Sequence, residues 1–181
     1  MKDPHKIIDQ LSHADALSVL RTLADGDERI ARRIAKIARD RLSDVDREEI
    51  ADALYADLDA LEVEEVWEQA GPKRHGYVEP TEAAYQMVER VLEPFLDELR
   101  KYQKLGMSDE SIQLCIGLLM GLYRFEHESA SEFKSWATDA PISFAAKVVE
   151  AWTMGRPSHA AVVALKEFIE EELGGWGQDL L

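Results

Sequence analysis

The chain has 181 residues, of which 46% are hydrophobic and 31% are charged, with 6 prolines and 10 glycines. This composition is typical of a folded, helix-rich protein and excludes an intrinsically disordered chain. The net charge of −15 disfavours general binding to nucleic acid, because an acidic surface repels phosphates. A single cysteine, Cys115, excludes an intramolecular disulfide and a multi-cysteine zinc site, so we expect a cytoplasmic protein with no metal and no cofactor.

The charge is unevenly distributed along the chain. Residues 1–42 hold nine Lys and Arg against seven Asp and Glu, whereas residues 43–181 hold twelve against twenty-nine. The longest unbroken apolar run, residues 115–123, is far shorter than the ~20 residues that span a bilayer. Charged residues also interrupt the first apolar run, unlike the apolar core of a signal peptide. We therefore expect no membrane association.

Helix signals follow one another through the first seventy residues. Ser12 with Asp15 forms a capping-box pattern, and Asp27 and Asp46 are N-cap residues that precede further apolar periodicity. The four predicted helices span about residues 12–24, 27–42, 46–61 and 63–71. Short turns between them predict two helical hairpins.

The middle of the chain predicts two longer helices. The fifth begins near residue 80 and ends at Gly106, and Pro94 inside it predicts either a kink or two abutting helices. The sixth, about residues 108–125, is apolar on two faces and is therefore expected at the centre of the fold. Gly117 and Gly121 lie one turn apart on it, which indicates either a close crossing by a neighbouring helix or two tolerated glycines.

Three more helices are predicted at about residues 130–138, 142–154 and 158–173. The whole chain, residues 1–181, is thus predicted to be a single all-α domain of about nine helices, arranged as an array of antiparallel helical hairpins in an αα superhelix of the HEAT or tetratricopeptide kind. Residues 175–181 form an apolar C-terminal tail with Trp176 and two leucines. The tail is expected either to cap the helical stack or to dock onto a second copy in a homodimer.

Two segments resemble a known family. They are LSHADALSVLRTLADGDERIARRIAKIA (residues 11–38) and RHGYVEPTEAAYQMVERVLEPFLDEL (residues 74–99), and they are similar to the helical-repeat region that follows the zinc finger in SWIM-type zinc-finger proteins. The resemblance covers about a third of the chain, and the finger itself is missing because it needs several cysteines. It implies an α-solenoid-like array and carries over no catalytic residues.

A basic stripe is predicted on one face of the second helix. At 100° per residue its five cations lie opposite the isoleucines of that helix; they are Arg29, Arg32, Arg33, Lys36 and Arg39. Such a stripe contacts either phosphates or an acidic partner. In the alternative interpretation, acidic residues of the next helix neutralise it; these are Glu48, Glu49, Asp52, Asp57 and Asp59.

A second candidate site lies in the connector GPKRHGYVEP, residues 71–80. Its glycines and prolines are explained by a helix end, a turn and a new helix start. Four residues are not explained in this way: Lys73, Arg74, His75 and Tyr77. They bind an anionic partner, or else the cations lie near the C-terminal dipole of the preceding helix while Tyr77 packs under the loop.

The sequence offers little chemistry for catalysis. It has no G-x-S-x-G elbow and no phosphate-binding glycine loop, and Cys115 lies among apolar residues. Glu126, His127 and Glu128 are consecutive, so on a helix they point about 100° apart and cannot converge on one metal ion. We therefore predict a non-enzymatic helical-repeat interaction scaffold for a protein partner, and as the alternative a nucleic-acid-associated accessory module that uses the basic stripe.

Overall fold

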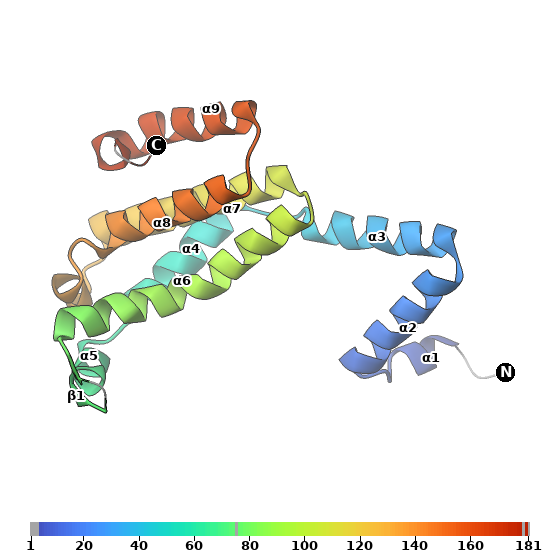
Figure 1. Cartoon of the computed structure of the whole chain (residues 1–181), viewed down its shortest axis with the longest axis horizontal. Helices are drawn as coiled ribbons and strands as arrows, with labels where there is room; N and C mark the ends of the chain where they lie inside the picture. The colour runs from blue at the N-terminus through green and yellow to red at the C-terminus, as the bar shows by residue number, and fades with distance from the viewer. Residues whose placement is uncertain (1–3, 75, 179, 181) are drawn as a thin grey trace. The chain divides into compact units, whose positions relative to one another are not determined.

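The computed structural model describes residues 4–74, 76–178 and 180 (Figure 1). Across these residues it contains nine α-helices and one small two-stranded sheet, so the all-α prediction is confirmed, whereas the stacked array of hairpins is not. Contacts within the chain divide it into two compact units, unit 1 (residues 1–44) and unit 2 (residues 45–181). That the two fold as a single domain stays a prediction, and each is described by itself.

Unit 1 consists of three helices: α1 (Pro4–Ile8), α2 (His13–Gly26) and α3 (Glu28–Leu42). Ser12 is the N-cap of α2 as predicted, because its Oγ accepts a hydrogen bond from the Asp15 backbone N–H at 3.2 Å. The Asp15 carboxylate in turn accepts a hydrogen bond from the Ser12 hydroxyl. Asp27 ends α2 and caps α3, accepting a hydrogen bond from the Arg29 backbone N–H. α1 was not predicted. None of residues 6–44 is buried, so this unit has no core of its own.

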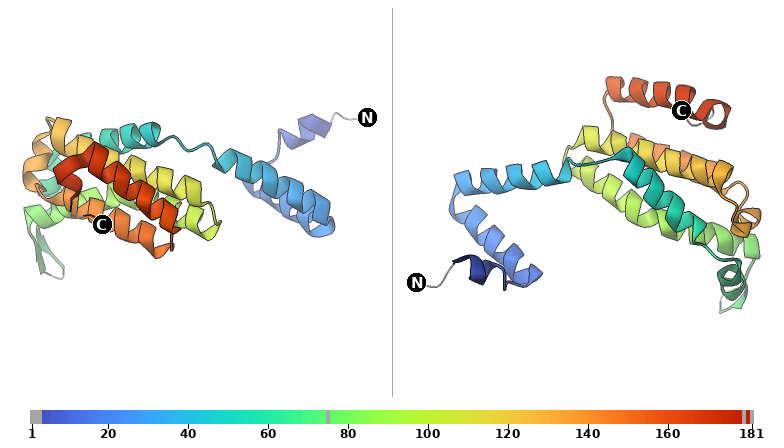
Figure 2. Two further views of the ribbon diagram at one scale, coloured as in Figure 1. Left: turned by 90° about the horizontal axis from the view of Figure 1, so that it is seen from above. Right: turned by 180° about the vertical axis from the view of Figure 1, so that it is seen from behind.

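Unit 2 contains the remaining elements in two groups (Figure 2). The first comprises α4 (Arg47–Asp59), α5 (Val63–Gln69), β1 (Gly71–Lys73), β2 (Gly76–Val78) and α6 (Pro80–Lys104). The second comprises α7 (Ser108–Glu128), the 3-10 helix η1 (Glu132–Trp136), α8 (Ala140–Met154), α9 (His159–Phe168), the π-helical turn η2 (Ile169–Leu173) and the 3-10 turn η3 (Gly174–Gly177). The α-helix predicted at 130–138 is thus a 3-10 helix, and the last predicted helix changes to a π-turn at Ile169.

The central helix of unit 2 is α7, as its two apolar faces predict. It packs against α4, α6, α8 and α9, and α4, α6, α7 and α8 lie side by side in the views of Figures 1 and 2. The expected close crossing is confirmed and its partner is α4. A Cβ placed on Gly117 would lie 2.8 Å from the Arg47 carbonyl oxygen, and one on Gly121 would lie 3.0 Å from the Ala51 carbonyl oxygen.

The long helix α6 is continuous through Pro94, so the alternative of two abutting helices is wrong. Pro94 lies on the exposed side of the helix. Proline at this position leaves the Arg90 carbonyl without its helical donor, and on the exposed side water can hydrate that carbonyl. The first turn agrees with the prediction, because Pro80 occupies the start of the helix.

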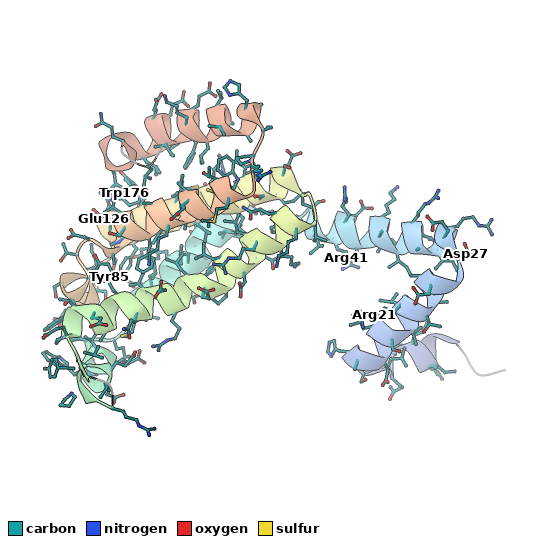
Figure 3. The ribbon with its side chains drawn as sticks, viewed as in Figure 1. Arg21, Asp27, Arg41, Tyr85, Glu126 and Trp176 are labelled. Carbon is teal, nitrogen blue, oxygen red and sulfur yellow. The ribbon has the colours of Figure 1, made fainter. Side chains whose placement is uncertain are left out.

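The C-terminal tail folds back onto α7 of its own chain. Trp176 Nε1 donates a hydrogen bond of 2.7 Å to Glu126 Oε2 (Figure 3), and its ring meets Tyr123 edge-on at 5.4 Å. Leu180 is buried. These contacts within one chain favour the predicted capping role. Docking of the tail onto a second copy stays a prediction.

Candidate interaction surfaces

The connector at residues 71–78 is a β-hairpin rather than the predicted loop. β1 pairs antiparallel with β2 in the register Gly71↔Val78, Pro72↔Tyr77 and Lys73↔Gly76. Gly71 (φ 95°) and Gly76 (φ 147°) adopt backbone conformations that favour glycine, as the turn prediction required. Strands of three residues carry too little alternation to be recognised in a sequence, which is why the hairpin was missed.

The four predicted site residues of this hairpin are not brought together in one site. Lys73 Nζ donates a hydrogen bond of 3.2 Å to the Glu68 carbonyl oxygen, near the C-terminal end of α5, so Lys73 follows the helix-dipole interpretation. Arg74 is exposed. Tyr77 is 60% exposed, and the interpretation that it packs under the loop is wrong. His75 lies outside the described residues.

Sequence reasoning missed an aromatic pair in unit 2. Trp67 of α5 meets Trp136 of η1 edge-on, with ring centroids 4.9 Å apart. Trp67 is 54% exposed. The two residues are far apart in the sequence, so no local pattern predicts their contact. Trp67 is exposed and Trp136 is half-buried, and an accessible tryptophan pair is typical of protein-binding surfaces.

The basic stripe of α3 is exposed along its whole length. All five of its cations are exposed: Arg29, Arg32, Arg33, Lys36 and Arg39. Arg32 pairs with Glu28 one turn away at 3.0 Å, and Arg29 lies 3.6 Å from Asp27. Within residues 4–44, no acidic side chain forms an ion pair with the other three cations. The helix therefore neutralises its own stripe only at its N-terminal end.

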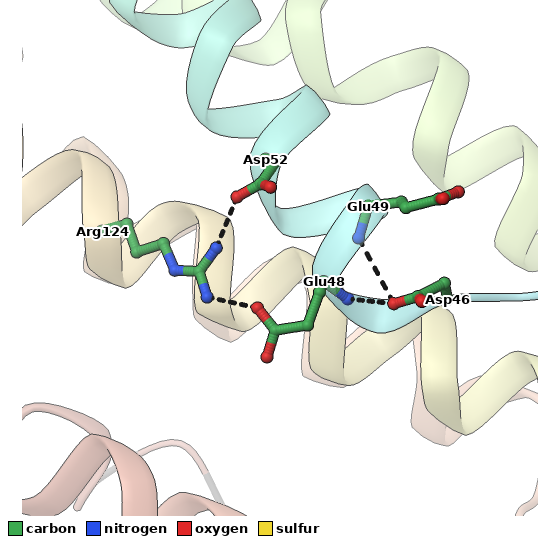
Figure 4. Close-up of polar contacts among 5 residues, drawn as sticks. All are labelled: Asp46, Glu48, Glu49, Asp52 and Arg124. Atoms are coloured by element: carbon green, nitrogen blue, oxygen red, sulfur yellow. Dashed lines mark hydrogen bonds and ion pairs between the residues drawn. The ribbon is translucent and has the colours of Figure 1, made fainter.

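The acidic residues predicted to neutralise this stripe have other partners within unit 2. Arg124 of α7 donates hydrogen bonds to Asp52 at 2.7 Å and to Glu48 (Figure 4). These bonds raise the pKa of the Arg124 guanidinium, chiefly through Glu48. Asp59 accepts a hydrogen bond from the Ser129 hydroxyl. Three of the five acidic residues thus bind α7 or the segment that follows it.

Unit 1 also carries exposed aliphatic side chains. Among the thirteen large hydrophobic side chains exposed in the described part of the chain, eight belong to unit 1: Ile7, Ile8, Leu17, Val19, Leu20, Leu23, Ile30 and Ile37. Unit 1 makes up about a quarter of the chain. The apolar periodicity of these helices does not reveal whether a second layer covers the face.

The residues considered for chemistry have structural roles. Cys115 is completely buried, and burial raises the pKa of its thiol well above the usual range. Glu126 binds Trp176, and the His127 ring stacks on Tyr123 at 4.0 Å. Among the residues that the structure describes, no group of three or more His, Cys, Asp or Glu side chains could hold a metal ion. None of the helices in this part of the chain is long and apolar enough to cross a bilayer.

Comparison with protein-family models, curated proteins and solved structures finds no match to this chain. The resemblance of residues 11–38 and 74–99 to the region that follows the SWIM-type zinc finger stays a prediction. Function is therefore argued from the surfaces alone.

Proposed function

We propose that the protein is a non-enzymatic interaction scaffold that binds a protein partner through unit 1. The observation that carries the proposal is that this unit buries none of its residues from 6 to 44 while exposing eight Leu, Val and Ile side chains. A pair of helices without a covered apolar face lacks the main source of folding free energy. A partner that covers this face would supply it.

The remaining predictions belong to the same proposal. A stacked αα superhelix is the architecture in which an amphipathic hairpin leaves one face available for a further layer. A cytoplasmic location agrees with a buried thiol and no requirement for disulfides. The absence of enzymatic activity is supported by Cys115, whose burial and raised pKa disfavour a thiolate nucleophile.

Site-specific photo-crosslinking in the cells that produce the protein tests this proposal. A photoreactive amino acid is placed at Leu23 in unit 1 and, as the matched control, at Leu105 in unit 2, because both leucines are 45% exposed. We expect adducts from position 23 and none from position 105. Mass spectrometry of the adduct identifies the partner. If position 23 forms no adduct, the proposal is wrong.

A second candidate function is supported by the exposure of the basic stripe. Arg33, Lys36 and Arg39 form no ion pair within residues 4–44, so they are available for phosphates. Reversal of Arg32, Arg33 and Lys36 to Glu is then expected to abolish binding to a duplex DNA or RNA probe. The single change Arg33→Glu should lower the slope of log affinity against log salt by about one.

The control is Arg21→Glu, an equal charge change on α2, outside the stripe. It should weaken binding less than Arg33→Glu does. If the wild-type protein does not bind the probe even at low ionic strength, where charges act over the longest range, this second function is excluded.

A further inference from the structure

We infer that the partner of unit 1 is a second copy of this chain, so that two α2–α3 hairpins bury their aliphatic faces against each other in a four-helix arrangement. This inference rests on the proposed function and names its partner. It concerns a different surface from the C-terminal tail, which is already occupied on α7.

The first argument is the placement of the aliphatic side chains. Ala16 and Ala24 of α2, and Ala31 and Ile34 of α3, are partly covered, which marks the faces on which the two helices touch. Helical periodicity then places four exposed residues on one common side of the hairpin: Val19, Leu23, Ile30 and Ile37. We call this set the aliphatic face.

The second argument is that this face is complementary to itself. A two-fold symmetric interface joins the same patch on both subunits, so the patch as a whole must be complementary to itself. Branched aliphatic side chains meet this condition, because they contain no donor or acceptor that would need a different partner. Two hairpins joined in this way form four helices around an apolar centre, which is the architecture of a four-helix bundle.

The third argument is charge. Residues 1–44 hold nine Lys and Arg against eight Asp and Glu, whereas residues 45–181 hold twelve against twenty-eight. Two copies that meet through unit 2 would bring two strongly negative surfaces together, which is unfavourable. Two copies that meet through unit 1 join nearly neutral surfaces. Four cations of the basic stripe lie about 80° or more around α3 from Ile30 and Ile37 and therefore stay in water: Arg29, Arg32, Lys36 and Arg39. Arg33 lies about 40° from Ile37, at the border of the aliphatic face, where its long side chain can extend into water.

Light scattering coupled to gel filtration tests the inference on the full chain. From about 1 µM to about 1 mM, a range that covers weak and moderate self-association, wild-type protein should approach twice the chain mass of 20.5 kDa. Leu23→Glu should return it to the single-chain mass, with a dissociation constant raised on the order of a hundredfold or more, because each interface would bury two unpaired carboxylates. Ile37→Glu should act in the same way.

Leu105→Glu is the matched control, with the same chemical change at a leucine of the same exposure, and it should remain a dimer. Because Leu23 and Ile37 are exposed within unit 1, their substitution leaves its internal contacts intact, and circular dichroism checks this. Wild-type protein that stays at the single-chain mass throughout, or a dimer that persists in both Leu23→Glu and Ile37→Glu, overturns the inference.

Crosslinking from position 23 separates this inference from the proposed function. An adduct between two copies supports both. An adduct with a different protein, together with a monomeric wild type, overturns the inference and leaves the scaffold proposal standing. An adduct that joins position 23 only to residues 45–181 of its own chain, or no adduct, overturns both.

Discussion

Gly117 of α7 and Ile50 of α4 approach so closely that a Cβ on the glycine would lie 2.8 Å from the isoleucine Cβ. The Arg47 carbonyl oxygen is equally near, and backbone atoms cannot rotate away. The contact between the two helices therefore requires a residue without a side chain at this position.

Gly117→Ala should destabilise unit 2 by about 1–2 kcal/mol. Overpacking costs about 1–3 kcal/mol, which outweighs the gain of up to about 1 kcal/mol in helix propensity. Urea unfolding followed by circular dichroism measures the change. Gly175→Ala is the control, because its Cβ would meet nothing within 4 Å. Equal stability of the two variants would show that α4 shifts freely to make room.

Arg124→Met should lower stability by about 1 kcal/mol, because it removes hydrogen-bonded ion pairs from α7 to both Glu48 and Asp52 of α4. The loss should shrink in 1 M salt, where the Debye length is about 3 Å. Arg100→Met provides the comparison, since Arg100 also pairs with two acids, Glu93 and Asp97, but within one helix. A larger loss of stability from Arg100→Met than from Arg124→Met would contradict the stabilising role of the ion pairs between α4 and α7.

Cys115 should make stability depend on alkaline pH. Burial raises the pKa of its thiol in the folded protein, whereas the unfolded thiol ionises near pH ~8.5. Above that pH the unfolded state releases a proton that the folded state keeps, so stability falls by up to about 1.4 kcal/mol per pH unit. Urea unfolding of the wild type and Cys115→Ala from about pH 7 to about pH 10, which spans the ionisation of an ordinary thiol, should show the steeper decline in stability in the wild type. Parallel curves would refute this.

Cys115 should also resist alkylation until the protein unfolds, because it is completely enclosed. Mass spectrometry after brief iodoacetamide treatment across a urea series should show modification that rises with the unfolding transition of unit 2. Rapid modification without urea would mean that the centre of the unit opens locally.

Deletion of residues 175–181 should reduce the stability of unit 2 without changing the oligomeric state. It removes the Trp176 hydrogen bond to Glu126 and uncovers the surface that Leu180 contributes to burying. Light scattering and thermal unfolding of the same samples measure both quantities. A change in mass would show that the tail joins two copies, contrary to its place on α7.

The sequence predicts most helices because their signals are local. Ser12 and Asp27 act as N-caps, and the two apolar faces of α7 predicted its central position. The contacts that define the surfaces are not local. Trp67 contacts Trp136, and Arg124 binds Glu48. The residues of each pair are far apart in the sequence, so helical periodicity does not predict these contacts. Arg124 and Glu48 meet because α4 and α7 cross at Gly117, so their contact can be derived only from the fold.

The candidate site was predicted less well than the fold. The exposure of the α3 cations agrees with a surface stripe, but the sequence did not predict the exposure of Ile30 and Ile37. Burial depends on a covering layer, and an amphipathic helix has the same pattern with or without one. The hairpin at residues 71–78 was missed because its strands are held by backbone pairing rather than by side-chain alternation.

A helical hairpin with no buried residue has few packing contacts that oppose the opening of its backbone hydrogen bonds. In a single chain, the amide protons of α2 and α3 should therefore exchange with deuterium much faster than those of α7, which lies among four other helices. Association would slow this exchange by mass action. The folded fraction of α2 and α3 would then depend on protein concentration. These helices would be more completely folded where the chain is abundant.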